Sequence, residues 1–155
     1  MVSTSDPVPN NRLCYYFEVR ILNPTEGVCR MDIGFTSRKI SFKEMVVRAK
    51  NGRSGFKSIP DSFGYSSTGS IYDSYSNERS SKRQEYAGGD VIRCYIDKQK
   101  AICSFTKNEE LLGKVLHIKD VTTPIFPTIA FYSNRTIIDC KFAQTDFEPD
   151  TEGTY

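Results

Sequence analysis

The chain has 155 residues, of which 38% are hydrophobic and 26% are charged, which is ordinary for a soluble globular protein with one core. Its net charge of +2 and its pI near 8.2 are too mild to indicate bulk binding of nucleic acid or of membranes. Apolar runs stay short of the ~18 residues of a membrane-spanning helix, and residues 1–11 lack the pattern of a signal peptide.

The first apolar runs along the chain have a period of two, which is typical of β-strands. Residues 15–21 (YYFEVRI) alternate between apolar and polar positions, and residues 30–36 place Met31, Ile33 and Phe35 on one face. Both runs are rich in β-branched and aromatic residues. They predict two strands whose alternate side chains enter a core.

Residues 37–61 interrupt the strand pattern and contain many more basic than acidic side chains. The basic residues are Arg38, Lys39, Lys43, Arg48, Lys50, Arg53 and Lys57. A long loop in a compact domain is usually functional or mobile. We therefore expect a long basic loop after the second strand.

The segment GDVIRCYIDKQKAICSFTKNEELLG (89–113) predicts a hairpin. Two alternating runs, 90–97 and 100–106, flank a short polar break. The side chains expected to face the core are those of Ile92, Cys94, Ile96, Ala101, Cys103 and Phe105. Before this hairpin, residues 66–86 are polar and serine-rich, with only a brief strand around Ile71 and Tyr72.

The last apolar runs, 124–132 and 136–142, continue the same pattern, and the second places Ile138, Cys140 and Phe142 toward the core. Short strands separated by Gly, Pro, Asn and Ser breaks indicate an all-β chain, folded as a two-sheet antiparallel β-sandwich. Residues 148–155 are acidic and aperiodic, and we expect them to form a flexible tail.

The five cysteines indicate free thiols rather than a disulfide framework or a zinc cluster. They are Cys14, Cys29, Cys94, Cys103 and Cys140. Their number is odd, and no two have C-x-x-C spacing. Most lie within or beside apolar runs, where a free thiol behaves as a small hydrophobic group. We therefore expect a reducing compartment, the cytoplasm or the nucleus.

Taken in order, these elements resemble the SPRY domain, most closely the Ran-binding-protein-M type that lacks the PRY strands. The matching segments are YYFEV (15–19), IGF (33–35), FGY (63–65), GDVIRCYID (89–97), FTKNE (105–109) and IFP (125–127). The resemblance covers residues 6–147, which we take as the domain. It implies a concanavalin-like sandwich, no catalytic activity and no cofactor.

Two departures mark the chain as a divergent member of this family. The family pattern has glycines where this chain has Arg93 and Glu109. Glycine at a tight turn supplies a positive φ that glutamate adopts poorly. We therefore expect this hairpin to have altered geometry. The chain also lacks tryptophan, which many members carry in the FGY segment.

The residues themselves do not support catalysis. The single histidine, His117, lies between Leu116 and Ile118, where a surface or core role is more common than a catalytic one. Residues 64–69 miss the spacing of a nucleophile elbow, and residues 112–115 lack the elements of a phosphate-binding loop. We expect no enzyme activity and no metal.

The resemblance implies a partner-binding surface on loops at one edge of the sandwich. The corresponding residues are Asp6, Pro7, Val8, Ser58, Tyr72, Tyr132, Ser133, Asn134 and Arg135. Tyrosines offer flat, rigid contact area with a polar tip, which suits an extended peptide. There are simpler alternatives. Tyr72 would only cover the sheet, and Asn134-Arg135 would only form a solvated turn.

The expected function is that of a non-catalytic adaptor that binds a partner protein or a short peptide. The resemblance extends to a ubiquitin-ligase scaffold, so recruitment of substrates to such a complex is one expected role. An RNA-associated or nucleic-acid-associated module using residues 38–57 is the alternative, since basic side chains there alternate with Phe42 and Phe56. Acidic partners or a merely solvated loop would explain the same charges. The oligomeric state stays open.

Overall fold

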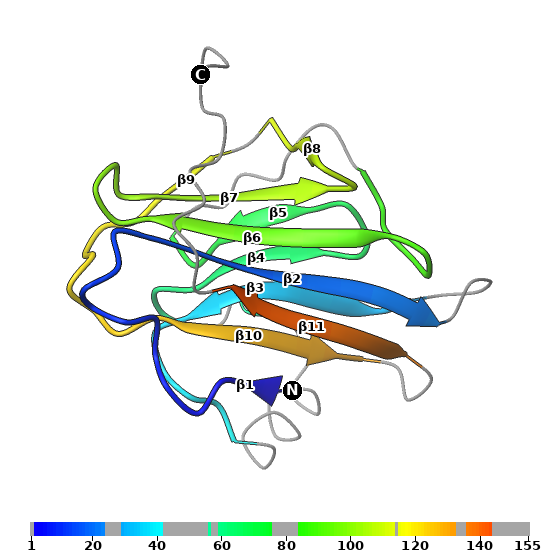
Figure 1. Ribbon diagram of the computed structural model, residues 1–155, viewed down its shortest axis with the longest axis horizontal. Coiled ribbons are helices and arrows are strands. Elements are labelled where there is room, and N and C mark those ends of the chain that lie inside the picture. Colours follow the sequence, from blue (N-terminus) through cyan, green and yellow to red (C-terminus); the bar gives the residue numbers. More distant parts are fainter. Residues whose placement is uncertain are drawn as a thin grey trace.

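The computed structural model describes residues 2–23, 29–41, 56, 59–75, 84–113, 115–132 and 136–143. These ranges contain strands and turns but no α-helix, and so none that is long and apolar enough to cross a membrane. The strands form two antiparallel sheets stacked face to face (Figure 1). The predicted all-β sandwich is thereby confirmed.

Each sheet combines strands from distant parts of the chain. Sheet A has the order β1 (Val2–Ser3), β10 (Phe126–Phe131), β3 (Met31–Thr36), β4 (Phe63–Ser66) and β5 (Ile71–Asp73). Sheet B has the order β11 (Ile137–Ala143), β2 (Cys14–Asn23), β6 (Val91–Asp97), β7 (Ile102–Lys107) and β8 (Glu110–Leu111), and β9 (Leu116–His117) also pairs with β7.

The predicted hairpin forms the middle of sheet B, and its alternate side chains enter the core. Ile92, Cys94, Ile96, Cys103 and Phe105 are each at most 1% exposed. Ala101 also packs against the core, but it is only partly buried, because it lies in the turn before β7 with φ at 54°.

β3 is buried on both of its faces. Met31, Ile33 and Phe35 face the core between the sheets, as their period of two predicts. The intervening residues lie on the outer face of sheet A, beneath a second apolar cluster. That cluster consists of Ile40, Phe56, Ile59 and Ala130, with Tyr72 packed against it. Residues from the 37–61 segment therefore cover the outer face of sheet A.

β11 turns its predicted face inward, but burial is incomplete. Ile138 and Cys140 are partly buried and Phe142 is 48% exposed. β11 is the edge strand of sheet B, and a cavity of about 400 Å³ separates it from β10. The sandwich is therefore open along this edge.

The long basic loop and the acidic tail fall mainly outside the described residues. Of the loop, only 37–41, 56 and 59–61 are described, and none of 148–155 is. Both remain predictions.

The expected altered geometry of the turn after β7 is wrong. Lys107 pairs with Glu110, which leaves Asn108 and Glu109 as a two-residue turn with φ at 49° and 72°. Positive φ at both positions is the type I′ conformation that hairpins favour. Glu109 thus adopts the left-handed backbone conformation that glycine would have. The turn keeps its geometry, and the cost is backbone strain at Glu109 itself.

The two positions that depart from the family pattern contact each other. Arg93 donates a hydrogen bond from Nε to Glu18 Oε2 at 2.7 Å, and its Nη2 lies 3.5 Å from Glu109 Oε1. The hydrogen bond to Glu18 is the main reason that the pKa of Arg93 is raised. Arg93 therefore links β2 and β6 to the turn.

Glu109→Gly should raise the free energy of unfolding by about 0.5–1 kcal/mol, because relief of left-handed strain outweighs the added freedom of the unfolded chain. Urea denaturation measures the change. Glu110→Gly in the neighbouring strand is the matched control and should be destabilising. Equal effects at the two positions would contradict the assignment of strain to Glu109.

Candidate partner-binding surface

Three residues from separate parts of the chain meet on the outer face of sheet A. Asp32, in β3, is 5% exposed, and its Oδ2 accepts hydrogen bonds from the hydroxyls of Tyr72 at 2.7 Å and Tyr132 at 2.8 Å. We call these three residues the tyrosine–aspartate cluster. It joins two predicted site residues through a carboxylate that the sequence did not single out.

Strand register explains why these side chains converge. Asp32 pairs with Ala130, so Tyr132, just beyond the end of β10, lies beside the beginning of β3, and its backbone N–H donates to Arg30 O at 2.8 Å. Across the sheet, Tyr72 is opposite Gly64 on β4. Tyr132 therefore approaches Asp32 from the side of the neighbouring β10, and Tyr72 reaches it from β5 across β4.

Gly64 makes room for the Tyr72 ring. A Cβ at this position would lie 2.9 Å from Tyr72 Cζ and 3.0 Å from Phe56 Cδ2. The backbone N–H of Phe56 in turn donates to the Tyr72 hydroxyl at 3.2 Å. This hydroxyl both donates and accepts, so Tyr72 is fixed against the sheet. Tyr72 therefore covers the outer face of sheet A, as the simpler alternative expected, and it also binds Asp32.

Burial dominates the electrostatics of the cluster. Burial raises the pKa of Asp32, while hydrogen bonds from Tyr72, Tyr132 and Ser66 oppose this shift. Burial, followed by the charge of Asp32, raises the pKa of Tyr72 well above its ordinary value. Tyr72 therefore keeps its proton at neutral pH and acts as a donor to Asp32.

Tyr132 presents the exposed part of the cluster. Its side chain is 37% exposed, while its hydroxyl is bound to the buried Asp32. The ring is thus accessible and anchored at the same time. Such a side chain can contact a partner with little loss of conformational freedom.

The predicted entry segment lies elsewhere on sheet A. Asp6 and Pro7 are exposed, but Val8 is 2% exposed, belongs to the core and donates from its N–H to Ile125 O at 2.7 Å. Its side chain packs inside rather than offering contact area. Ile125 and Tyr132 flank the two ends of β10, roughly 20 Å apart for extended chain. These segments therefore do not gather at one point.

Several predicted partner-binding residues fall outside the described residues. They are Ser58, Ser133, Asn134 and Arg135. Their roles stay predictions.

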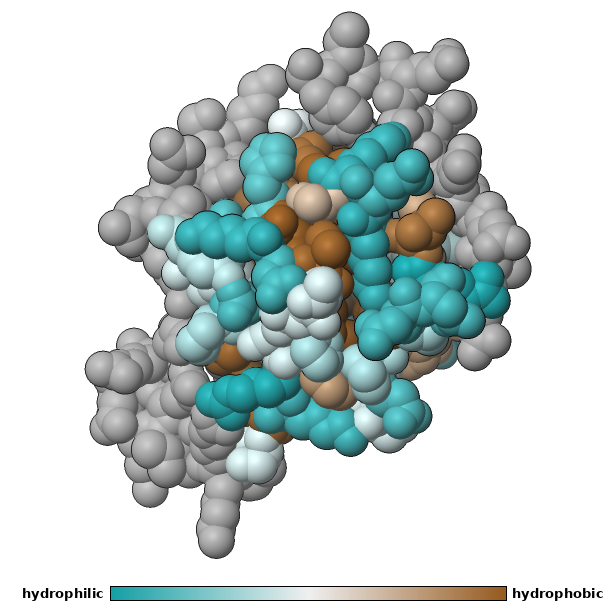
Figure 2. Space-filling view, turned by 90° about the vertical axis from the view of Figure 1, so that its left-hand side faces the viewer, coloured by the Kyte–Doolittle hydropathy of each residue, from teal (hydrophilic) through white to brown (hydrophobic). Residues whose placement is uncertain are grey.

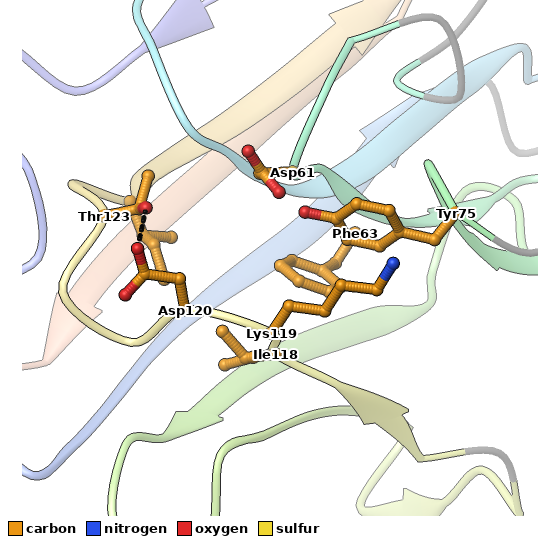
Figure 3. A pocket seen from close by; sticks show the side chains of 8 residues that line it. Asp61, Phe63, Tyr75, Ile118, Lys119, Asp120 and Thr123 are labelled. Carbon is orange, nitrogen blue, oxygen red and sulfur yellow. Dashed lines mark hydrogen bonds between the residues drawn. The ribbon is translucent and has the colours of Figure 1, made fainter.

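A shallow cleft lies near the entry segment and was not anticipated from the sequence. Figure 3 shows Lys119 extending across the ring of Tyr75, with its Nζ 3.6 Å from the ring centroid. Asp61 and Asp120 flank this pair, and the enclosed volume is only about 10 Å³, room for one water molecule.

The end of the sandwich seen in Figure 2 is mostly hydrophilic, with a narrow hydrophobic strip.

Two of the predicted basic residues are described. Arg38 and Lys39 follow β3, and Lys39 Nζ lies 5.9 Å from the centroid of the Phe126 ring. The others, Lys43, Arg48, Lys50, Arg53 and Lys57, lie outside the described residues.

Neither the single histidine nor the acidic side chains form a metal-binding group among the described residues. His117 is exposed on β9. Within the ranges that the structure covers, no group of three or more His, Cys, Asp or Glu side chains could hold a metal ion. A sandwich with an anchored aromatic surface has the characteristics of a protein-interaction module.

Sequence comparison identifies the family. The chain belongs to the SPRY domain family, which it matches over residues 14–143. This match lies within the predicted domain limits, 6–147.

Known relatives are Ran-binding proteins. The chain is 28% identical over 149 residues to the Drosophila melanogaster Ran-binding proteins 9/10 homolog and 26% identical over 152 residues to human Ran-binding protein 9. These alignments cover 96% and 97% of the chain but only 14% and 19% of the relatives. The chain thus corresponds to a small part of each.

Solved structures support the same fold. The SPRY domain of human HERC1 matches 96% of this chain and 81% of its own with a TM-score of 0.58 at 17% identity. Another human SPRY domain matches 91% of this chain and 81% of its own with a TM-score of 0.62 at 19% identity.

Replacing Asp32 by Asn should change how stability depends on pH. Because the pKa of Asp32 is raised on folding, the native state holds this proton more tightly than the unfolded chain does. The wild type should therefore lose stability relative to Asp32→Asn as the pH rises from about 4 toward neutrality. Urea denaturation at a series of pH values measures the difference, and the opposite slope would show a lowered pKa.

Proposed function

We propose that this SPRY domain is an adaptor that holds an extended segment of a partner protein against the tyrosine–aspartate cluster. The observation that carries the proposal is the anchored Tyr132 ring, exposed on one side and hydrogen-bonded to a buried carboxylate on the other. Aromatic side chains of this kind dominate the energy of many protein interfaces.

The spacing of the exposed groups suits an extended occupant. Tyr132 lies at one end of β10, and Asp6 and Pro7 lie near the other. An extended chain of about six or seven residues spans such a distance. Tyr132 would supply the main aromatic contact, and the predicted site residues Asn134 and Arg135 would bind the peptide backbone or a carboxylate.

The cellular setting is part of the proposal. The five cysteines are free thiols, which supports a cytoplasmic or nuclear location. Relatives named as Ran-binding proteins support an adaptor role within a larger protein. Recruitment of a substrate to a ubiquitin ligase or another complex is the specific form that we propose.

Tyr132→Ala should reduce partner capture at least tenfold, whereas Tyr132→Phe, which keeps the ring but loses the hydrogen bond to Asp32, should reduce it by less. Affinity capture from cell extract with quantitative mass spectrometry measures both. Leu111→Ala, an exposed apolar residue on β8, is the matched control. Melting temperatures separate lost contact from lost folding. Normal capture by a folded Tyr132→Ala variant would refute the assigned surface.

The alternative, nucleic-acid contact through the basic segment, has one supporting observation. Lys39 lies beside the Phe126 ring, so a positive charge and an aromatic group are neighbours just after β3. Binding of this kind would use Arg38 and Lys39 together with the basic residues that follow them in sequence.

Nucleic-acid contact predicts retention on labelled single-stranded RNA that weakens steeply as salt rises, because bound phosphates release counterions. The joint Arg38→Glu and Lys39→Glu variant should reduce that retention. Absence of retention at low salt would remove this alternative and leave the peptide proposal intact.

A further inference from the structure

β11 forms an accessible edge of sheet B. Among the described residues it pairs with β2 alone, and Figure 1 shows it as the last strand of its sheet. The backbone N–H and C=O groups on the other side of a seven-residue edge strand can pair with another strand. Edge strands are usually protected by charged side chains or by β-bulges. β11 carries outward-facing charges and one register shift, between Ile137 and Ile138, and the strand from Ile138 onward is regularly paired.

The outward-facing charges of β11 continue rows of alternating sign across sheet B. Lys141 is opposite Glu18, which is opposite Arg93, and Asp139 is opposite Arg20. Each row therefore ends at β11 with a charged side chain, Lys141 in one row and Asp139 in the next. A strand paired to this edge would continue the alternation if it placed an opposite charge beside each of them. Opposite charges directly across a strand pair are stabilising, and like charges are destabilising.

A second copy of β11 supplies those opposite charges. If two copies run antiparallel with Cys140 opposite its counterpart, Asp139 is opposite Lys141 of the second copy, and Lys141 is opposite Asp139 of the second copy. The row then reads Arg93, Glu18, Lys141, followed by Asp139 and Arg20 of the second copy. The sign of the charge therefore alternates along the row from one copy into the other.

Neighbouring registers lack this match. A shift of two residues in one direction places Asp139 opposite its own counterpart, and a shift in the other direction places Lys141 opposite its own counterpart. Both juxtapose like charges. The sequence of β11 therefore favours one register of self-pairing.

The inward-facing side chains match in the same register. Ile138 becomes opposite Phe142 of the second copy, and Phe142 becomes opposite Ile138. Phe142 is 48% exposed and lines the cavity beside β11 together with Ile138 and Cys140. Pairing would extend this apolar layer and shield the mouth of the cavity from water.

We infer that β11 is a self-association surface, through which two copies of this chain join sheet B into one continuous antiparallel sheet about a two-fold axis at Cys140. The interface is isologous, so each copy offers the same strand. Because the paired strand is short, association is weak and depends on concentration.

The test measures the mass of the 155-residue chain by light scattering over a concentration series into the high micromolar range. The wild type should rise from 17.6 kDa toward twice that mass. Asp139→Lys and Lys141→Asp should each remain at 17.6 kDa, because each places like charges across the join. An equimolar mixture of the two variants should recover dimers, since each then meets its opposite charge.

Recovery in the mixture shows that both variants are folded, even though each also places like charges opposite one another within its own sheet, at Arg20 or at Glu18. Glu110→Lys, on β8 in the same sheet, makes the same charge change as Asp139→Lys and should dimerise normally. A wild type that stays monomeric throughout overturns the proposal. Dimers that persist in both single variants, or a mixture that stays monomeric, overturn it as well. Dimers that form only after removal of residues 144–155 would assign the edge to the chain's own C-terminal residues instead.

Discussion

Burial of β3 on both faces is the constraint on which the remaining structure depends. One face builds the core between the sheets, and the other carries Asp32, Gly34 and Thr36 beneath the second apolar cluster. A Cβ at Gly34 would lie 1.9 Å from the carbonyl oxygen of Phe63, so β4 could not pair at its present distance with any larger residue there. The close pairing of β3 with β4 therefore requires glycine at position 34.

Covering a sheet face that contains polar groups requires partners for those groups. Thr36 and Thr128 share a hydrogen bond of 2.8 Å between their hydroxyls, and Asp32 is satisfied by Tyr72 and Tyr132. Leaving a buried carboxylate without partners would cost several kcal/mol. The same hydrogen bonds that stabilise the buried face hold the exposed Tyr132 ring in place, so the contacts that stabilise the fold also support the proposed partner surface.

The period of two was sufficient to predict the sandwich, most of the core and the longer strands β2, β3, β6, β7, β10 and β11, because alternate side chains of each enter the core between the sheets. The short strands β1, β4, β8 and β9 have too few residues to show this period. The tyrosine–aspartate cluster could not be found in this way. Asp32 and Tyr132 are 100 positions apart, and their contact depends on the register between β3 and β10. The partial burial of Phe142 likewise depends on strand order, since an inward-facing residue at a sheet edge has a neighbour on one side only. The burial of Val8 could not be predicted either, because this residue precedes the first long strand and belongs to no alternating run.

The contact between Arg93 and Glu109 links two substitutions that look independent in sequence. The backbone penalty of a side chain at position 109 is partly offset by the ion pair with Arg93, while Arg93 keeps its stronger bond to Glu18 whichever residue occupies the turn. The effect of losing the turn glycine therefore depends on whether Arg93 is already present, which is epistasis in its simplest form. The expected consequence is that Glu109 costs more stability in a chain with glycine at position 93 than it does in this one.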